Sequence, residues 1–134
     1  MPAPHVRSAA VALLLLAGLA AGCTSGMATG VEIRIHYSHF EPSTLTVPYG
    51  VPITFTLVNE DPIDHEWLIG DAAFHERHRR GTEAHHGGRP NEVSLPPLTT
   101  FETTLTFSSA GTLEYICHFP GHEAYGMIGT LTIT

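Results

Sequence analysis

Apolar and polar residues alternate along most of this chain, in short runs that Pro and Gly residues interrupt. A two-residue period is typical of a β-strand that turns one face towards a core. The runs lie at 31–37, 45–47, 53–59, 65–69, 93–95, 100–107, 112–117 and 128–133. Many short strands with turn residues between them predict an all-β domain, either an antiparallel sandwich or a barrel.

One segment departs from this two-residue period. Residues 71–80 have helical character, with Asp71 suited to the N-cap and Gly81 to the stop, and a polar loop continues to Pro90. We therefore expect one short helical and loop insertion at about residues 71–90. The rest of the domain, residues 31–134, is expected to be strands and turns.

The first 22 residues have the pattern of a secretory signal peptide. Arg7 gives a basic start, residues 8–21 are almost entirely apolar, and small residues precede Cys23. The apolar run of about 14 residues is too short to cross a hydrocarbon core of about 30 Å comfortably. Residues 1–22 are therefore predicted to be a signal peptide, and a retained membrane anchor is the alternative.

The segment that ends at Cys23 resembles the lipobox of bacterial lipoproteins. The resemblance is carried by Leu19, the small residues 20–22 and Cys23 itself. It implies that Cys23 becomes the acylated first residue of the mature chain, and residues 23–30 then form a flexible tether. Plain secretion after ordinary cleavage is the alternative. Either route predicts an exported protein, periplasmic or at the cell surface. We expect its only contact with a membrane to be through the N-terminal lipid.

The charge balance of the chain is acidic. Its 134 residues include six Lys plus Arg and 13 Asp plus Glu, for a formal net charge of −7 with His neutral. An acidic surface argues against nucleic-acid binding and suits a protein that stays soluble or meets basic partners. The ten histidines are an excess that needs a chemical explanation.

The residues after the 112–117 strand carry metal-binding chemistry. Cys117, His122 and Met127 follow a Cys-x4-His-x4-Met spacing. Blue-copper sites use one thiolate, two imidazoles and a weak axial thioether. Singly, these residues would fit a buried thiol, a loop histidine and a core methionine, but jointly they predict copper. The second imidazole must come from elsewhere, and His65, which opens a strand, is the candidate.

This loop resembles the C-terminal loop of the cupredoxins, the family of plastocyanin, azurin and rusticyanin. The matching segments are Tyr115-x-Cys117, Pro120-Gly121-His122, Gly126-Met127-x-Gly129 and the upstream pair of Asn59 and His65-Glu66-Trp67. The loop spacing is that of rusticyanin-like members. The resemblance covers residues 31–134 and implies a Greek-key β-sandwich, with one type 1 copper held by His65, Cys117, His122 and Met127. Two features depart from the family pattern: Glu66 stands where Asn or Ser often follows the upstream ligand, and residues 71–90 are inserted.

Four more histidines crowd this insertion: His75, His78, His85 and His86. His75 and His78 are three residues apart and would share one face of a helix. Imidazoles at such spacing bind Cu(II), Zn(II) or Ni(II), so a second metal site is one interpretation. A solvated loop whose histidines tune surface charge is the other. His118 is expected to point away from the ligand side of its strand.

The predicted function is electron transfer by an extracytoplasmic type 1 copper protein. A four-ligand site has no open position for a substrate, and the sequence contains no His-x-His pair of the kind that the resemblance associates with copper oxidases, so we expect no enzyme. We expect a monomer that meets redox partner proteins transiently near His122, over an apolar rim of Phe119, Pro120 and Ala124. The alternative is an envelope copper-binding protein for tolerance, storage or delivery, aided by the His-rich insertion.

Overall fold

A computed structural model describes residues 29–81, 86 and 88–134 of the chain. The predicted signal peptide, Cys23 and most of the predicted tether lie outside these residues.

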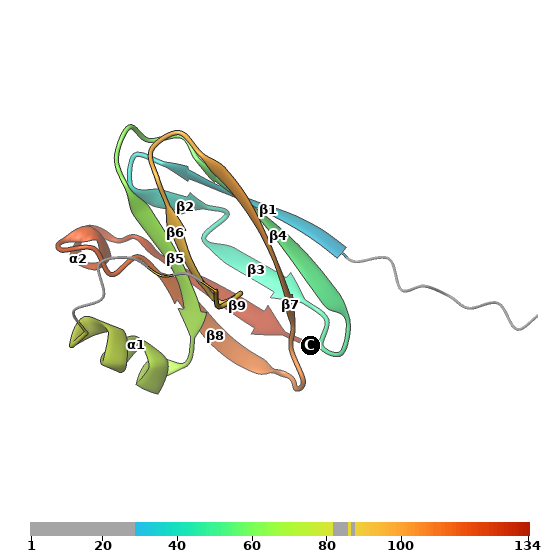
Figure 1. Cartoon of the computed structure of the whole chain (residues 1–134). Coiled ribbons are helices and arrows are strands. Elements are labelled where there is room, and N and C mark those ends of the chain that lie inside the picture. Colours follow the sequence, from blue (N-terminus) through green and yellow to red (C-terminus); the bar gives the residue numbers. More distant parts are fainter. Residues whose placement is uncertain (1–28, 82–85, 87) are drawn as a thin grey trace, which may run out of the picture.

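Two β-sheets pack face to face, so the predicted all-β sandwich is confirmed (Figure 1). The four-stranded sheet has the order β2 (His39–Glu41), β1 (Thr29–His36), β4 (Pro52–Asn59) and β7 (Thr100–Thr106). The five-stranded sheet has the order β3 (Thr44–Val47), β9 (Ile128–Ile133), β8 (Gly111–Ile116), β5 (His65–Gly70) and β6 (Glu92–Leu95). The predicted strand runs all correspond to strands of these sheets.

Both sheets are mixed, and here the prediction of an antiparallel arrangement is wrong in part. Strand β1 pairs in parallel with β4, and β3 pairs in parallel with β9. The other pairings are antiparallel. Alternation could not reveal this difference, because a half-buried strand has the same two-residue period whichever way its neighbour runs.

The core lies between the sheets and is built from the apolar positions of the alternating strands. Ile53, Phe55 and Leu57 of β4 are fully buried and face Trp67 of the opposite sheet, whose ring centroid lies 5.0 Å from that of Phe55. Burying a side chain of this size contributes about 1.5–3 kcal/mol, so the alternating strands supply most of the driving force for folding.

Strand β5 is buried on both faces, because the predicted insertion covers its outer side. The insertion begins with α1 (Ala72–Arg79), where the Asp71 carboxylate caps the helix by accepting a 2.7 Å hydrogen bond from the backbone N–H of Phe74. The Phe74 ring packs so tightly on Gly70 that a Cβ there would lie 2.3 Å from its Cδ1 atom. The predicted helix is confirmed, and it shields the outer-face residues Glu66 and Leu68 from water.

Two short elements were not predicted. Strand β2 has three residues, and α2 (His122–Tyr125) has four. Neither is long enough to show a period in the sequence. Within the described part of the chain, no helix has the length and apolar character needed to cross a bilayer.

Candidate metal centre

Three of the four predicted copper ligands converge at one end of the sandwich. His65 opens β5, and Cys117 directly follows β8, its antiparallel neighbour, so the two side chains start from the same end of the sheet. The Nδ1 atom of His122 lies 3.2 Å from the Nδ1 atom of His65 and 3.3 Å from the Sγ atom of Cys117. Two imidazoles and one thiol therefore surround a single point, with their donor atoms all within 4.8 Å of one another.

The loop after Cys117 places Met127 next to these groups. Gly121 (φ 87°) and Gly126 (φ 105°) bound α2 with left-handed backbone that favours glycine. The turn is closed by a 3.0 Å hydrogen bond from the Met127 N–H to the carbonyl of His122, and the Cys117 N–H donates to the carbonyl of Met127 at 3.3 Å. Met127 is 0% exposed, and these two hydrogen bonds place its backbone beside those of Cys117 and His122.

A buried carboxylate orients the upstream imidazole. The Nε2–H of His65 donates to Oδ2 of Asp61 at 2.9 Å, which leaves the Nδ1 lone pair facing His122. Burial alone would raise the pKa of Asp61, but hydrogen bonds from the N–H groups of Ser38 and Tyr37, at 2.7 and 2.8 Å, and from His65 lower it, so the carboxylate is ionised. Burial lowers the pKa of His65, which keeps its ring neutral and able to bind a cation.

Asn59 braces the turn that carries this carboxylate. Its side-chain nitrogen lies 2.9, 3.1 and 2.9 Å from the carbonyl oxygens of Ile63, Leu95 and Pro96, and its side-chain oxygen accepts from the Asp61 N–H at 3.0 Å. Asp61 was not among the predicted site residues. Its position four residues before His65 was the only signal for the contact between them.

The environment of Cys117 suits a thiolate bound to a soft cation. The side chain is 0% exposed, and burial raises the pKa of the thiol to about 11. The N–H groups of Phe119 and Glu66 oppose this rise, and the latter lies 3.4 Å from the sulfur. A cation that replaces the thiol proton would be held by this sulfur and by two imidazoles, which is the donor set that copper prefers. The residues present therefore fit a type 1 copper.

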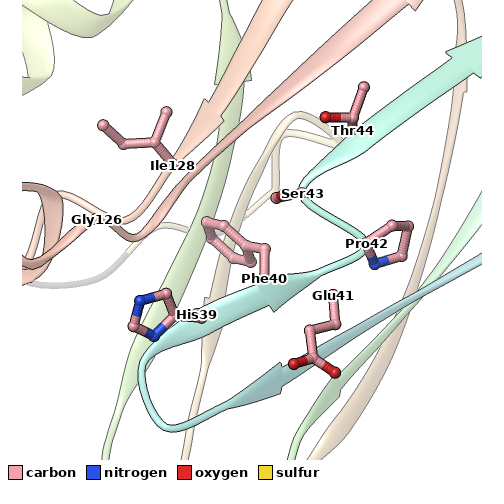
Figure 2. Close-up of a pocket in the computed structure, with 8 residues that line it drawn as sticks. All are labelled: His39, Phe40, Glu41, Pro42, Ser43, Thr44, Gly126 and Ile128. Carbon is pink, nitrogen blue, oxygen red and sulfur yellow. The ribbon is translucent and has the colours of Figure 1, made fainter.

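A shallow pocket lies beside this centre but does not include it. Figure 2 shows the pocket between β2, the turn into β3 and the start of β9, with His39 on one side and Gly126 and Ile128 on the other. The His39 ring also contacts the ring of Tyr125, at 5.0 Å between centroids. None of the four predicted copper ligands lines this pocket.

The structure brings together two of the four insertion histidines that were predicted to form a second site. His78 and His86 lie close to Glu92, with one ligand atom from each within 4.8 Å of the others. Glu92 was not predicted, because it follows the insertion on a different element. His85 lies outside the described residues.

His75 does not belong to this second cluster, which corrects the prediction. It shares the sheet-facing side of α1 with His78, but its Nε2–H donates to the carbonyl of Glu114 at 3.0 Å and its Nδ1 lies 2.9 Å from Nε2 of His118. Burial lowers the pKa of His75 and lowers that of His118 to about 4. Both rings serve to dock α1 on the sheet. His118 points away from the copper ligands, as predicted.

Comparison with known proteins places these features in a family. Residues 7–133 match the family model described as a cupredoxin-like domain. The copper-resistant cuproprotein CopI of Pseudomonas aeruginosa is 30% identical over 135 residues, which cover 77% of this chain and 75% of that protein. A protein of the same name from Rubrivivax gelatinosus is 30% identical over 97 residues, 70% of this chain and 59% of that protein. This chain thus spans less than two thirds of the second relative.

Solved structures show the same fold. The dithionite-reduced auracyanin of Roseiflexus castenholzii is 25% identical and superposes with a TM-score of 0.67, over 81% of this chain and 99% of that one. Rusticyanin from Thiobacillus ferrooxidans shares the fold at 20% identity and a TM-score of 0.55, over 79% of this chain and 78% of that one.

Proposed function

This chain belongs to the cupredoxin-like family of copper proteins, and from that premise we propose that it acts in electron transfer, with His65, Cys117, His122 and Met127 as its copper ligands. Bound copper supplies one-electron chemistry between Cu(I) and Cu(II). The observation that carries the proposal is the closed convergence of these side chains. Three of the four are 0% exposed, and only His122 reaches towards the surface.

Contacts within the chain hold these ligands in position. Asp61 fixes the ring of His65, the backbone of Glu66 donates towards the Cys117 sulfur, and the α2 turn fixes the last two ligands. Ligands that the protein holds in this way need little rearrangement when the charge of a bound metal changes. This property favours an electron carrier, and because four protein ligands leave no open position for a substrate on the metal, we propose that the chain is not an enzyme.

The surroundings of His122 suit transient contact with a partner protein. Phe119 lies against the His122 ring, with 5.9 Å between centroids, and Pro120, Ala124 and Tyr125 are exposed around it. An apolar rim of this kind buries little area and releases its partner quickly. We propose that a monomeric protein exchanges electrons with redox partner proteins through this surface.

Copper tolerance is a second candidate for the physiological role. It is favoured by the name of the CopI relatives, copper-resistant cuproprotein, and by the presence of two groups of metal-binding side chains. Storage or delivery of copper would use the same centre. Under either role we propose an exported protein, periplasmic or at the cell surface, with a lipid on Cys23.

Spectroscopy of the copper-loaded protein tests the proposed ligands. We expect intense visible absorption from thiolate-to-Cu(II) charge transfer, its loss in Cys117→Ser, and its retention in the matched control Cys23→Ser. A Cys117→Ser variant that keeps the colour would contradict the assignment.

Electron self-exchange between oxidised and reduced copies, measured by NMR line broadening, tests the surface. Like charges placed across a contact cost several kcal/mol, so we expect Ala124→Glu to slow exchange by roughly tenfold or more. Thr104→Glu, an exposed position on β7, should leave the rate unchanged. If both variants exchange at the unmodified rate, the surface around His122 is not the route. Growth of a deletion strain on copper, with and without the Cys117→Ser gene, tests the tolerance role separately.

A further inference from the structure

We propose a second metal site, for a divalent cation of the Zn²⁺ or Cu²⁺ class. Its ligands are His78 of α1, His86 of the following loop and Glu92 of β6, and Glu66 of β5 orients His86. The site shares no ligand with the copper centre. It therefore stands whether or not the copper centre transfers electrons.

The three ligand side chains leave separations that suit a metal ion better than direct hydrogen bonds. Nε2 of His78 lies 3.8 Å from Oε1 of Glu92, and Nδ1 of His86 lies 3.4 Å from Oε2 of the same carboxylate. Both distances exceed the ordinary range of about 2.7–3.2 Å for a hydrogen bond. Two donors bound at about 2.0–2.1 Å to one tetrahedral ion lie ~3.4 Å apart, which is close to what is observed.

The contacts of both rings turn one nitrogen of each towards Glu92. Nδ1 of His78 lies 2.9 Å from the carbonyl oxygen of Phe74, so this nitrogen carries the proton and Nε2 faces Glu92. Nε2 of His86 makes an ion-pair contact of 3.3 Å with Oε1 of Glu66, and its Nδ1 faces Glu92. A ligating imidazole whose other nitrogen donates to a carbonyl or a carboxylate is the usual arrangement in protein metal sites.

The register of β5 and β6 places the carboxylates on one face. Glu66 lies opposite Ser94, and Leu68 lies opposite Glu92, so both carboxylates point to the outer side of the five-stranded sheet. The backbone N–H of His86 donates to Oγ of Ser94 at 2.8 Å, which ties this residue to the same face. Two regular strands and a helix therefore position the site, and His86 is held against the strands by this hydrogen bond.

Burial gathers two carboxylates and two imidazoles into a cluster that a bound cation would stabilise. The side chains of Glu66, His86 and Glu92 are 3%, 4% and 6% exposed. Two buried carboxylates near one another are costly unless positive charge is close. Arg89 pairs with Glu92 at 2.9 Å, but its side chain is 71% exposed, so solvent screens its charge. A divalent ion between the two imidazoles and Glu92 would supply the charge inside the cluster.

The site opens to a cleft through which an ion could enter. The cleft has a volume of about 920 Å³ and is lined by His78 and His86 together with Phe119 and Pro120 of the copper loop. Two nitrogen donors and one oxygen donor leave a fourth position for water. This donor set selects borderline divalent cations over Ca²⁺ and Mg²⁺, which prefer all-oxygen sites.

Zinc titration of the full chain already loaded with one copper tests the site. Isothermal calorimetry and metal analysis after gel filtration should show one Zn²⁺ per chain with the blue absorption unchanged. His78→Gln and His86→Gln should each weaken zinc binding at least tenfold. Glu66→Gln should weaken it less, because it removes only the group that orients His86. The matched control is His36→Gln, another histidine near a carboxylate, with 3.7 Å between its Nδ1 and Oε2 of Glu60.

Three results would overturn the proposal. The first is that the copper-loaded chain binds no zinc. The second is that both His78→Gln and His86→Gln bind zinc with unchanged affinity. The third is that the blue colour is lost in proportion to the added zinc, which would place the zinc at the copper centre. Circular dichroism and the thermal midpoint check that each variant is folded. If the chain takes up no copper, the same titration in Cys117→Ser reports on the second site alone, so its failure is distinct from that of the copper assignment.

Discussion

Asp61 is predicted to hold the upstream copper ligand in place, and two substitutions separate this role from its part in stability. The carboxylate accepts three hydrogen bonds: Oδ1 from Tyr37, and Oδ2 from both Ser38 and His65. Asp61→Ala removes all three. Asp61→Asn keeps one side-chain oxygen. This oxygen should take the Oδ2 position, where it can accept from both Ser38 and His65. The amide nitrogen then takes the Oδ1 position, where it faces the N–H of Tyr37 and only that hydrogen bond is lost.

The number of hydrogen bonds that each substitution removes sets the expected loss of stability. A hydrogen bond to a charged group contributes about 1.5–3 kcal/mol, so Asp61→Asn should lower the free energy of unfolding by about 2 kcal/mol. For Asp61→Ala we expect about 4 kcal/mol, below the sum of three bonds because water reaches part of the emptied space. Loss of an outer partner of a ligating histidine costs 10–100-fold in metal affinity, and we expect this of Asp61→Ala alone.

Urea unfolding of the metal-free protein measures the stability, and competition with a copper chelator measures the affinity. Asp64→Ala is the matched control, because Asp64 is exposed in the same turn and should change the stability by no more than about 0.5 kcal/mol. If Asp61→Ala binds copper as tightly as the unmodified chain, the contact with His65 has no positioning role. If Asp61→Asn loses as much affinity as Asp61→Ala, the charge rather than the geometry is what His65 needs.

Three further outcomes are expected. Gly129→Ala should lower the free energy of unfolding, measured with urea, by about 1–3 kcal/mol or more, because a Cβ at this position would lie 2.0 Å from Cε2 of Tyr115. Gly30→Ala is its control, since a Cβ there would have no atom within 4 Å. Copper at 100 times its dissociation constant should raise the free energy of unfolding by about 2.7 kcal/mol over the chelated protein, and an equal rise in Cys117→Ser would show that the metal binds elsewhere. Arg79→Ala should lower the free energy of unfolding by less than about 1 kcal/mol and leave the blue spectrum intact, because the ion pair of Arg79 with Glu123 lies at the surface. A changed spectrum would mean that this ion pair supports the loop that carries His122.

The sequence predicted the strands well, since each alternating run has one face in the core. It could not predict the parallel pairing of β1 with β4, because pairing direction depends on where the chain returns and leaves no trace in the period of either strand. Strand β2 and helix α2 were missed because three or four residues are too few to show a period.

The sequence could predict that Cys117 and His122 lie together, because the loop holds three of the proposed copper ligands within eleven residues, where spacing restricts geometry. The second cluster was only partly predictable. Glu66 and His86 are far apart in the chain, and their contact depends on the insertion folding over the outer face of β5. His75 was assigned wrongly to that cluster, because helical spacing predicts which face a side chain occupies and not which partner it finds there.

Glu66 shows why the insertion matters to the copper centre. Its backbone N–H lies 3.4 Å from the Cys117 sulfur, while its carboxylate accepts from the His118 N–H at 3.2 Å and faces His86. Burial is the main reason that the pKa of the Cys117 thiol is raised, and the negative charge of Glu66 adds to the rise and so opposes the thiolate that copper requires. A cation bound at the proposed second site, next to His86, would offset that carboxylate. Glu66, which departs from the family pattern, and the insertion, which the smallest family members lack, are therefore in contact, and a cation held by the insertion would compensate for the charge of Glu66.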